Sequence, residues 1–372
     1  MAVIRPRSSS LLEKMNIPPY LTKIKMVDLA EFTELEQGHF PRPKFANARL
    51  LANGVQLPQS IAHRGYKAAY PENTMVSFVG AVEAGAHALE TDIHLTRDDV
   101  VVLSHDPTLK RCFGRPEKII DCDWNFISKL RTTAEPPSPM PRLKDLLEYL
   151  ASPGLENIWV LLDIKLDCDP TDVMRLIAAT IASVPPSPKR PWKDRIVLGI
   201  WATKYLSLCE DYLPDFPVCF IGFSTSYARR FFSVPNISFN MLHQVLHGPV
   251  GASFIRKAKE LNREIFAWTV NDENRMRWCI RKELDGVVTD DPKKFLEICK
   301  DYEELPVEKS VKSKEKYKMG DWMHILKIQV LVTVFFMLFR FKYGWTVEAK
   351  YKHVPKRRKG TGWQEKTVER TL

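Results

Sequence analysis

The chain has 372 residues, of which 45% are hydrophobic, and its formal net charge is +10 at pH 7. This length suits one large α/β barrel of about 250 residues with additional segments at its ends. Residues 306–372 carry 16 Lys and Arg against 6 Asp and Glu, so the tail accounts for the whole net charge. We expect no nucleic-acid partner, because the basic residues flank an apolar stretch and no nucleic-acid-binding module is recognisable.

The cysteine pattern indicates a reducing compartment. Seven cysteines, an odd number, form no CxxC or Cys/His metal motif, and several lie in apolar runs. We therefore expect reduced thiols in a cytosolic environment. The first twenty residues lack the apolar core of a signal peptide, so secretion is not expected. Their early Arg and Ser residues loosely resemble a mitochondrial transit peptide, although Glu13 and the prolines argue against one.

Residues 1–58 are rich in Pro, Lys and Glu, and we expect an N-terminal extension that wraps the body or is partly disordered. From residue 60, short apolar runs typical of strands buried on both faces alternate with helical patterns. The expected strands are 60–63, 88–92, 100–104, 158–163, 196–200, 218–221, 237–239, 265–269 and 286–288. The expected helices are 74–84, 142–151, 171–183, 203–211, 225–232, 251–262, 272–282 and 292–300.

This alternation predicts an α/β fold, a (β/α)8 TIM-type barrel over residues 59–300. An open doubly wound sheet is the alternative, which the absence of a GxGxxG motif after any strand disfavours. The strand candidates exceed the eight barrel positions by one. The extra strand lies either within 88–104, where the link is too short for a crossover helix and predicts a hairpin or an irregular joint, or at the weak 237–239. The Pro-rich segment 106–141 is expected to form a long active-site loop.

The C-terminal part divides into a charged linker at 301–322, an apolar segment at 323–345 and a basic tail at 346–372. The most apolar stretch, Val330–Phe339, is too short to cross a bilayer alone. We favour a membrane-embedded or interfacial segment; a single tilted span and a helix packed against the barrel are the alternatives. The basic cluster at 350–359 suits an anionic membrane surface. The expected location is therefore a membrane with the barrel in the cytosol; the endoplasmic reticulum, a lipid droplet and the mitochondrial surface all remain open.

Several strand candidates end in residues that can do chemistry, as catalytic barrel strands do at their carboxyl ends. Glu90 and Asp92 are two residues apart on one strand, so their side chains leave the same face. Asp163 and Lys165 have the same relation on another strand. Three converging carboxylates would repel each other, so we expect a divalent cation between them. Oxygen ligands of this kind favour Mg²⁺ or Ca²⁺, whereas any one pair alone would suggest a salt bridge.

His63 and His105 each close a strand, and Arg64 follows the first of them. Two imidazoles beside a metal suggest a general acid and a general base near neutral pH. Arg64 and Lys165 are candidate phosphate contacts. Together these groups predict hydrolysis of a phosphodiester. A second pair, His243 and His247, has no carboxylate nearby in the sequence and is interpreted as structural.

Residues 62–106 closely resemble the glycerophosphodiester phosphodiesterase family, with HRG, PENT, E-x-D and HD in order. Later segments WTVN at 268–271 and DGVVTDDP at 285–292 also match, and the family's E-x-K stands here as Asp163-Ile164-Lys165. The chain is most similar to the fungal phosphatidylglycerol phospholipase C branch. The resemblance implies a role for each candidate site residue. His63 and His105 would be the catalytic pair, and Arg64 and Lys165 would contact the phosphate. Glu90, Asp92 and Asp163 would hold the metal with Glu72 beside them, and Trp268 would line the substrate pocket.

Three positions leave alternatives open. The shorter Asp163 side chain replaces the usual Glu, so its coordination through water is possible and the metal preference is open. Glu72 could instead cap the helix that follows it, and Trp268 could belong to the core.

The expected reaction converts phosphatidylglycerol to diacylglycerol and glycerol 3-phosphate, because the glycerol headgroup has a hydroxyl beside the phosphate ester that ethanolamine and choline lack. One alternative is a glycerophosphodiester phosphodiesterase or lysophospholipase D, with the tail as a mere anchor. A non-catalytic lipid-binding protein is another. The oligomeric state stays open.

Overall fold

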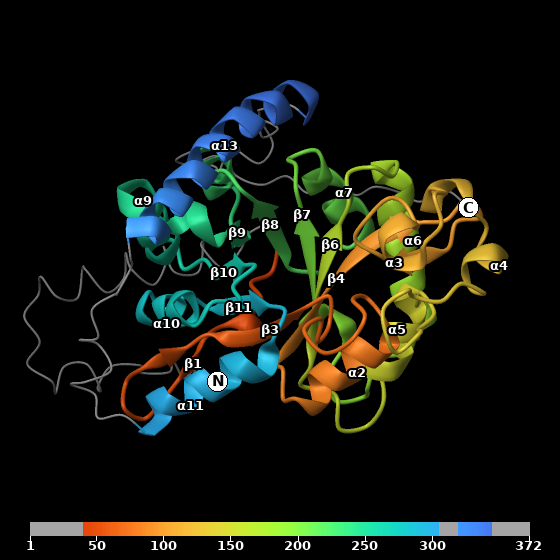
Figure 1. The fold of residues 1–372 in the computed structure, drawn as a ribbon, viewed down its shortest axis with the longest axis horizontal. Coiled ribbons are helices and arrows are strands. Elements are labelled where there is room, and N and C mark those ends of the chain that lie inside the picture. The colour runs from red at the N-terminus through yellow and green to blue at the C-terminus, as the bar shows by residue number, and fades with distance from the viewer. Residues whose placement is uncertain (1–39, 305–318, 344–372) are drawn as a thin grey trace, which may run out of the picture.

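Parallel strands close into a barrel in the computed structural model, which describes residues 40–304 and 319–343 (Figure 1). Round the barrel, each strand pairs in parallel with the next, and β11 pairs with β3 to close the ring. The strands, in ring order, are β3 (Gln59–His63), β4 (Ala88–Leu95), β6 (Trp159–Ile164), β7 (Ile196–Ile200), β8 (Val218–Gly222), β9 (Ser238–Leu242), β10 (Ile265–Trp268) and β11 (Gly286–Thr289). The predicted (β/α)8 barrel is confirmed within the described residues.

The extra strand is β5 (Val101–Leu103), which pairs antiparallel with the end of β4. A tight turn joins the two strands: Thr96 N donates to Val100 O at 3.0 Å, and Asp99 has a φ of 63°. The hairpin prediction for 88–104 is therefore confirmed. The weak candidate at 237–239 is a true barrel strand, β9, because it pairs with a neighbour on each side.

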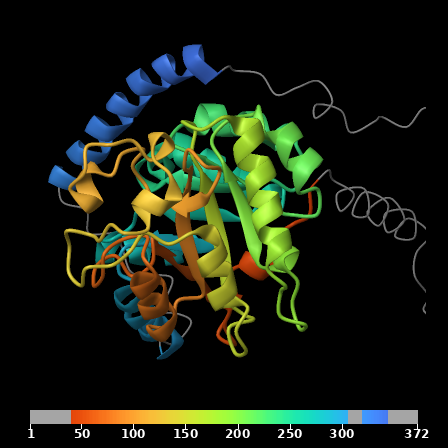
Figure 2. The same ribbon diagram turned by 90° about the vertical axis from the view of Figure 1, so that its right-hand side faces the viewer.

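Helices surround the strands, and Figure 2 shows this outer layer from the side. The helices that follow barrel strands, directly or after the inserted segment, are α2 (Met75–Glu83), α5 (Leu143–Leu150), α6 (Pro170–Ser183), α7 (Tyr205–Tyr212), α8 (Thr225–Ala228), α9 (Gly248–Glu260), α10 (Glu273–Arg281) and α11 (Pro292–Glu304). Thr74 caps α2 by accepting from Ser77 N, and Gly85 leaves the helix with a φ of 89°. Segment 106–141 is mostly irregular, with two short helices, α3 (Lys110–Phe113) and α4 (Trp124–Ile127).

The amino-terminal end of the barrel is filled with apolar side chains. Trp159, Leu161 and Phe266 are buried in this inner cluster, and Phe45 closes it from below with its ring 5.8 Å from that of Trp159. Phe45 belongs to a single 3-10 turn, Lys44–Ala46, within the predicted extension. Two short strands follow it, β1 (Arg49–Leu50) and β2 (Gln56–Leu57). Residues 1–39 lie outside the described part. Since the floor is packed, the interior can bind a ligand only from the carboxyl end.

A long helix, α13 (Met319–Tyr343), lies over that carboxyl end, above β8 and β9 in Figure 1. Ile325 is buried, Val332 packs against the core, and Gln329 Nε2 donates to Gln244 O at 2.9 Å. In the described residues no helix is long and apolar enough to cross a bilayer. One face of α13 thus packs against the barrel, which was an alternative for this segment. Residues 305–318 and 344–372, with most of the linker and all of the basic tail, lie outside the described part.

Candidate active site

A pocket at the carboxyl ends of the strands contains the predicted site residues. Its walls are formed by His63, Arg64, Glu90, Asp92, His105, Asp163, Lys165, Trp201, Ile221, Asn240, Trp268 and Val288. All eight residues expected to act in catalysis, to contact the phosphate, to line the substrate pocket or to hold the metal are in this set, and Glu72, expected beside the metal, is not. Segments more than 200 residues apart in the chain therefore meet at one end of the barrel.

Three buried carboxylates form the base of the site. Glu90, Asp92 and Asp163 each offer an oxygen, and these atoms lie within 4.8 Å of one another. Burial, together with the charges of Asp92 and Asp163, raises the pKa of Glu90 well above its ordinary value. The excess negative charge behind that shift is what a divalent cation would neutralise. Because every donor is a carboxylate oxygen, the set fits a hard cation.

Two cations partly neutralise the carboxylates. Lys165 Nζ lies 2.6 Å from both Asp92 Oδ1 and Asp163 Oδ2. Arg64 Nε lies 3.3 Å from Asp92 Oδ2. Although burial opposes it, Lys165 and Arg64 lower the pKa of Asp92 far below its usual range. Asp92 therefore stays ionised in a position where an isolated carboxylate would be protonated.

Each predicted catalytic histidine is held by an aspartate. His63 Nδ1 lies 2.6 Å from Asp290 Oδ1, and His105 Nδ1 lies 2.8 Å from Asp106 Oδ1. Although burial opposes this shift, the hydrogen bond from His63 lowers the pKa of Asp290 to about 2. Against the effect of burial, hydrogen bonds from Arg111 and His105 likewise lower the pKa of Asp106 to about 2. Both aspartates are thus ionised acceptors, so Nδ1 carries the proton on each ring. The Nε2 atoms are left to act as bases.

Burial lowers the pKa of both histidines. For His63 the hydrogen bond to Asp290 opposes this effect, and for His105 the charge of Asp92 does. Both rings are therefore neutral at lower pH than a free histidine, which suits proton transfer near neutrality.

Glu72 lies beside the site in an ion-pair network. Its carboxylate accepts from Arg64 at 2.8 Å and from Arg111 at 2.8 Å, and Arg111 also donates to Asp106 at 2.7 Å. It lies outside the group of three carboxylates whose oxygens are within 4.8 Å of one another. The alternative that Glu72 caps the next helix is wrong, because Thr74 caps it.

Trp268 lines the pocket, as expected, and its indole Nε1 donates to Asn240 O at 3.0 Å. Its ring stands edge-on to that of Trp201 with centroids 5.8 Å apart. The side-chain oxygen of Asn240 is buried in the pocket wall without a hydrogen-bond partner among the described residues. Three strands separate β9, which carries Asn240, from β4 in either direction round the ring, so Asn240 faces Glu90 and Asp92.

Sequence reasoning missed several supporting residues. Trp201 Nε1 donates to Asp163 Oδ1 at 2.6 Å, and Asn73 Nδ2 donates to Asp92 Oδ2 at 2.8 Å. Asn73, Asp106 and Asp290 lie within the quoted motifs PENT, HD and DGVVTDDP, so a reading of each motif letter could have found them. Trp201 directly follows the strand candidate at 196–200. The other site residues were identified by the same kind of position at the end of a strand.

A second group of possible ligands lies just outside the pocket. His94, Asp167 and Cys168 have donor atoms within 4.8 Å of one another. His94 Nδ1 lies 3.1 Å from Asp167 Oδ2, and its Nε2 lies 3.2 Å from the backbone oxygen of His105. Although burial opposes it, the bonds to Asp167 and Cys168 raise the pKa of His94 to about 9. An imidazolium of this kind donates from both nitrogens and supports the segment that carries His105.

The pair His243 and His247 lies away from the pocket. Both are buried, and the ring of His247 stacks at 4.1 Å on that of Trp278. This packing agrees with the structural interpretation of the pair.

Comparison with known proteins supports the prediction that this site hydrolyses phosphodiesters. A glycerophosphodiester phosphodiesterase of Caldanaerobacter subterraneus is 25% identical over 249 residues, which cover 64% of this chain and 96% of that protein. Human lysophospholipase D GDPD1 is 44% identical over 68 residues, 18% of this chain and 22% of that protein. The fold of a solved protein from Silicibacter pomeroyi DSS-3 matches with a TM-score of 0.61 and 20% identity, covering 72% of this chain and 98% of that one. The model of the Glycerophosphoryl diester phosphodiesterase family matches residues 63–294, well over half of the chain, and the protein therefore belongs to that family of phosphoric diester hydrolases.

Proposed function

We propose that the protein is a metal-dependent phospholipase C that converts phosphatidylglycerol to diacylglycerol and glycerol 3-phosphate. One observation carries the hydrolytic part of this proposal. Two imidazoles, the buried His63 and the partly exposed His105, each have Nδ1 bound to an ionised aspartate and share a pocket with three carboxylates and two cations. This combination provides a base, an acid and charge neutralisation, which a phosphodiester requires.

Glu90, Asp92 and Asp163 would hold the cation, and Mg²⁺ or Ca²⁺ fits their oxygen donors. When bound, the cation would neutralise charge on the non-bridging phosphate oxygens. Arg64 and Lys165 contribute further positive charge to the same phosphate. Trp201 and Asn73 orient Asp163 and Asp92 by donating to them. Supporting hydrogen bonds of this type hold carboxylate ligands in position.

The histidines transfer protons at their Nε2 atoms. One accepts the proton of the glycerol hydroxyl beside the phosphate ester, and that oxygen attacks phosphorus. The other, which must be protonated at Nε2 as well when the substrate binds, donates that proton to the departing diacylglycerol oxygen, so that bond breaks and a cyclic glycerol phosphate forms. Water then opens the ring with the two roles exchanged. Asn240 supplies the polar group on the opposite wall, where it can contact a headgroup hydroxyl.

A lipid substrate is supported by the surface next to the pocket. Six apolar side chains of α13 are more than half exposed: Met323, Leu326, Val330, Leu331, Val334 and Met337. A contiguous apolar surface of this kind is typical of a membrane contact. The basic cluster at 350–359 follows in the sequence and suits anionic lipids. We propose that the protein binds the cytosolic face of a membrane, and its seven free cysteines accord with that compartment.

A second candidate is hydrolysis on the other side of phosphorus, as a glycerophosphodiester phosphodiesterase or lysophospholipase D. The partial similarity to a lysophospholipase D favours it as the alternative. The same pocket would then activate the free hydroxyl of a lysolipid backbone and expel the headgroup alcohol. Diacyl phosphatidylglycerol has no free backbone hydroxyl, so only its headgroup can supply the attacking oxygen.

Hydrolysis of a lipid panel tests the two candidates. The protein is incubated separately with phosphatidylglycerol, phosphatidylethanolamine and lysophosphatidylcholine, with and without chelator. The products are identified by mass spectrometry. We expect diacylglycerol from phosphatidylglycerol only, loss of activity with chelator and recovery with Mg²⁺ or Ca²⁺. Release of lysophosphatidic acid and choline as the main reaction would support the second candidate. A His105→Ala variant that binds vesicles and still hydrolyses lipid normally would contradict both candidates, because both need His105 for proton transfer.

A further inference from the structure

Two further cavities lie between the active-site pocket and α13, and neighbouring cavities share lining residues. Trp201 and Ile221 line both the active-site pocket and a small cavity beside it. Phe223 and Ser224 line both that cavity and a larger cleft. The far wall of the cleft is α13, which contributes Gln329, Val332 and Thr333. Neighbouring cavities therefore share residues all the way from the carboxylates to the outer helix.

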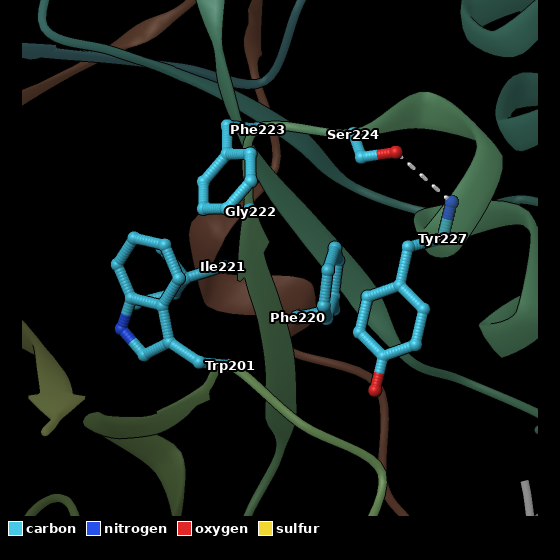
Figure 3. A pocket seen from close by; sticks show the side chains of 7 residues that line it. All are labelled: Trp201, Phe220, Ile221, Gly222, Phe223, Ser224 and Tyr227. Carbon is cyan, nitrogen blue, oxygen red and sulfur yellow. Dashed lines mark hydrogen bonds between the residues drawn. The ribbon is translucent and has the colours of Figure 1, made fainter. Parts of the chain in front are cut away.

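The first step of this path is apolar. The small cavity is lined by Trp201, Ile221 and Phe223, with Phe220 and Tyr227 beyond them. Figure 3 shows the rings of Trp201 and Phe223 together on one side of β8, while Phe220 and Tyr227 lie on the other. Two hydroxyls lie nearby, and both are hydrogen-bonded: Ser224 Oγ accepts from Tyr227 N at 3.3 Å and so caps the turn, and Tyr227 OH accepts from Thr203 N at 3.3 Å. A ligand passing here would meet aromatic faces.

The cleft has aliphatic side chains on both of its walls. Val245, Pro249 and Val250 form its wall on the barrel, and Val332 faces them from α13. The polar residues of α13 in this wall already bind main-chain oxygens. Gln329 Nε2 donates to Gln244 O at 2.9 Å, and Thr333 Oγ1 donates to Gln329 O at 2.8 Å. Aliphatic side chains thus face each other across the cleft, while Ser224, Thr225, Ser226 and His247 complete its barrel side.

The outer end of the cleft reaches an exposed apolar surface. Val250 at the start of α9 is 62% exposed, and Val330 and Val334 on α13 are 58% and 56% exposed. Met323, Leu326, Val330, Val334 and Met337 recur at spacings of three and four residues, so they form one stripe along the helix. Water is a poor solvent for such a stripe. The cleft therefore lies between the neighbourhood of the active site and the proposed membrane contact.

We propose that the cleft beneath α13 binds an acyl chain of the lipid substrate, with Phe223 at its entrance and Val332 as its outer wall. This inference rests on the proposed function and deepens it. The phosphate lies between Arg64 and Lys165, the glycerol backbone passes Trp201, and the chain runs beneath α13 toward the membrane. An acyl chain suits the site because it makes no hydrogen bonds and gains affinity from each buried methylene.

Monomeric substrates test the cleft without a membrane. Dihexanoyl phosphatidylglycerol below its micelle concentration is compared with its deacylated form, glycerophosphoglycerol. We expect the wild type to favour the acylated diester through a lower KM, by about tenfold for every two methylenes buried. Val332→Asp and Phe223→Ala should lower kcat/KM for the acylated diester about tenfold or more, because each removes apolar contact with the chain. Both variants should keep kcat/KM for the deacylated diester.

Val330→Asp is the matched control, because Val330 lies on the same helix but points to solvent and does not line the cleft. It should leave both monomeric reactions unchanged while weakening binding to anionic vesicles. A fluorescent fatty acid, cis-parinaric acid, gives a readout that needs no catalysis. It should bind the wild type and Val330→Asp, and bind Val332→Asp and Phe223→Ala about tenfold or more weakly.

Two results would overturn the acyl-chain site. One is a wild type that hydrolyses both diesters equally well and does not bind the fatty acid. The other is a pair of cleft variants that lower both reactions to the same extent and leave fatty-acid binding intact, which would show a purely structural contact. A wild type that binds the fatty acid but hydrolyses neither glycerol diester would instead refute the proposed substrate and leave the acyl-chain site standing.

Discussion

Lys165 Nζ lies 2.6 Å from Asp92 Oδ1 and 2.6 Å from Asp163 Oδ2, and so joins the carboxyl ends of β4 and β6. The two aspartates stand side by side in the sheet, because Asp92 pairs in register with Asp163. Although burial opposes it, these two carboxylates raise the pKa of Lys165 above its ordinary value. The lysine is therefore charged at neutral pH, and it balances part of the acidic cluster.

Replacing Lys165 with Met should uncover the repulsion among the three carboxylates. Breaking a buried ion pair leaves an uncompensated charge, so we expect the metal-free variant to lose about 3–5 kcal/mol in its free energy of unfolding. Mg²⁺ or Ca²⁺ should raise Tm more in the variant than in the wild type, because the cation replaces the missing charge. Thermal unfolding with chelator and with added cation measures both effects. Equal cation-induced shifts in the two proteins would contradict a metal site at these carboxylates.

Replacing Asp290 with Asn should move one limb of the pH–activity profile. The Asp290 carboxylate raises the pKa of His63, against the larger lowering by burial. Without that charge the pKa of His63 falls further, so the limb of kcat/KM that follows its protonation should move to lower pH. Loss of the oriented base should also reduce kcat about 100-fold or more. The profile is recorded from pH 4 to 9; a limb that stays in place would show that His63 does not titrate in the reaction.

The same shift predicts the effect of acid on stability. Because burial lowers the pKa of His63 below 6.5, the folded protein disfavours the charged ring. The contribution of His63 to the free energy of unfolding is therefore complete above pH 6.5. It is lost as the pH falls through the lower pKa that His63 has in the folded protein. A His63→Phe variant should lose less stability than the wild type between pH 6.5 and 5 in denaturant titrations. Parallel losses in the two proteins would place the acid sensitivity elsewhere.

Replacing Trp201 with Phe should weaken metal binding while keeping the ring. The indole N–H donates to Asp163 Oδ1 at 2.6 Å, and Phe lacks this donor. Loss of such a supporting bond typically reduces metal affinity about 10- to 100-fold. The cation concentration for half-maximal activity should rise accordingly, while kcat at saturating cation changes little. Trp268→Phe is the matched control, since its indole donates to the backbone of Asn240 and to no carboxylate.

Replacing Asn240 with Leu should separate stability from activity. The buried Asn240 oxygen has no partner among the described residues, and an apolar side chain of the same shape removes that unpaired group. We expect the free energy of unfolding to rise by about 1 kcal/mol. Activity on phosphatidylglycerol should fall about tenfold, because the contact with a headgroup hydroxyl is lost. A decrease in both quantities would mean that Asn240 serves only to pack the barrel.

Much of the site could be predicted from local patterns alone. Glu90 and Asp92 share a face of β4 because strand side chains alternate, and His63 and Asp163 end apolar runs that could only be buried strands. The hairpin after β4 followed from a link too short for a crossover. These features depend on the period and length of a single segment.

Other features depended on contacts that no local pattern encodes. Trp201, Asp290 and Asn240 reach the pocket because the closed ring brings β7, β11 and β9 to the same end. Glu72 carries the charge of a metal ligand, yet it pairs with Arg64 and Arg111, and Arg111 comes from the loop segment 106–141. The position of α13 over the barrel rim was likewise one of several possibilities for an apolar stretch.

The amino-acid sequence by itself determined the barrel, the order of its strands and the acids, bases and cations at their ends, since these follow from hydrophobic periodicity and from the alternation of side chains along a strand. Only the tertiary structure decided which carboxylate pairs with which cation, which groups orient the histidines, and that α13 forms one wall of a cleft near the pocket. Those relations depend on distances between segments that are remote in the chain, and these distances are set when the ring closes and the helices pack around it.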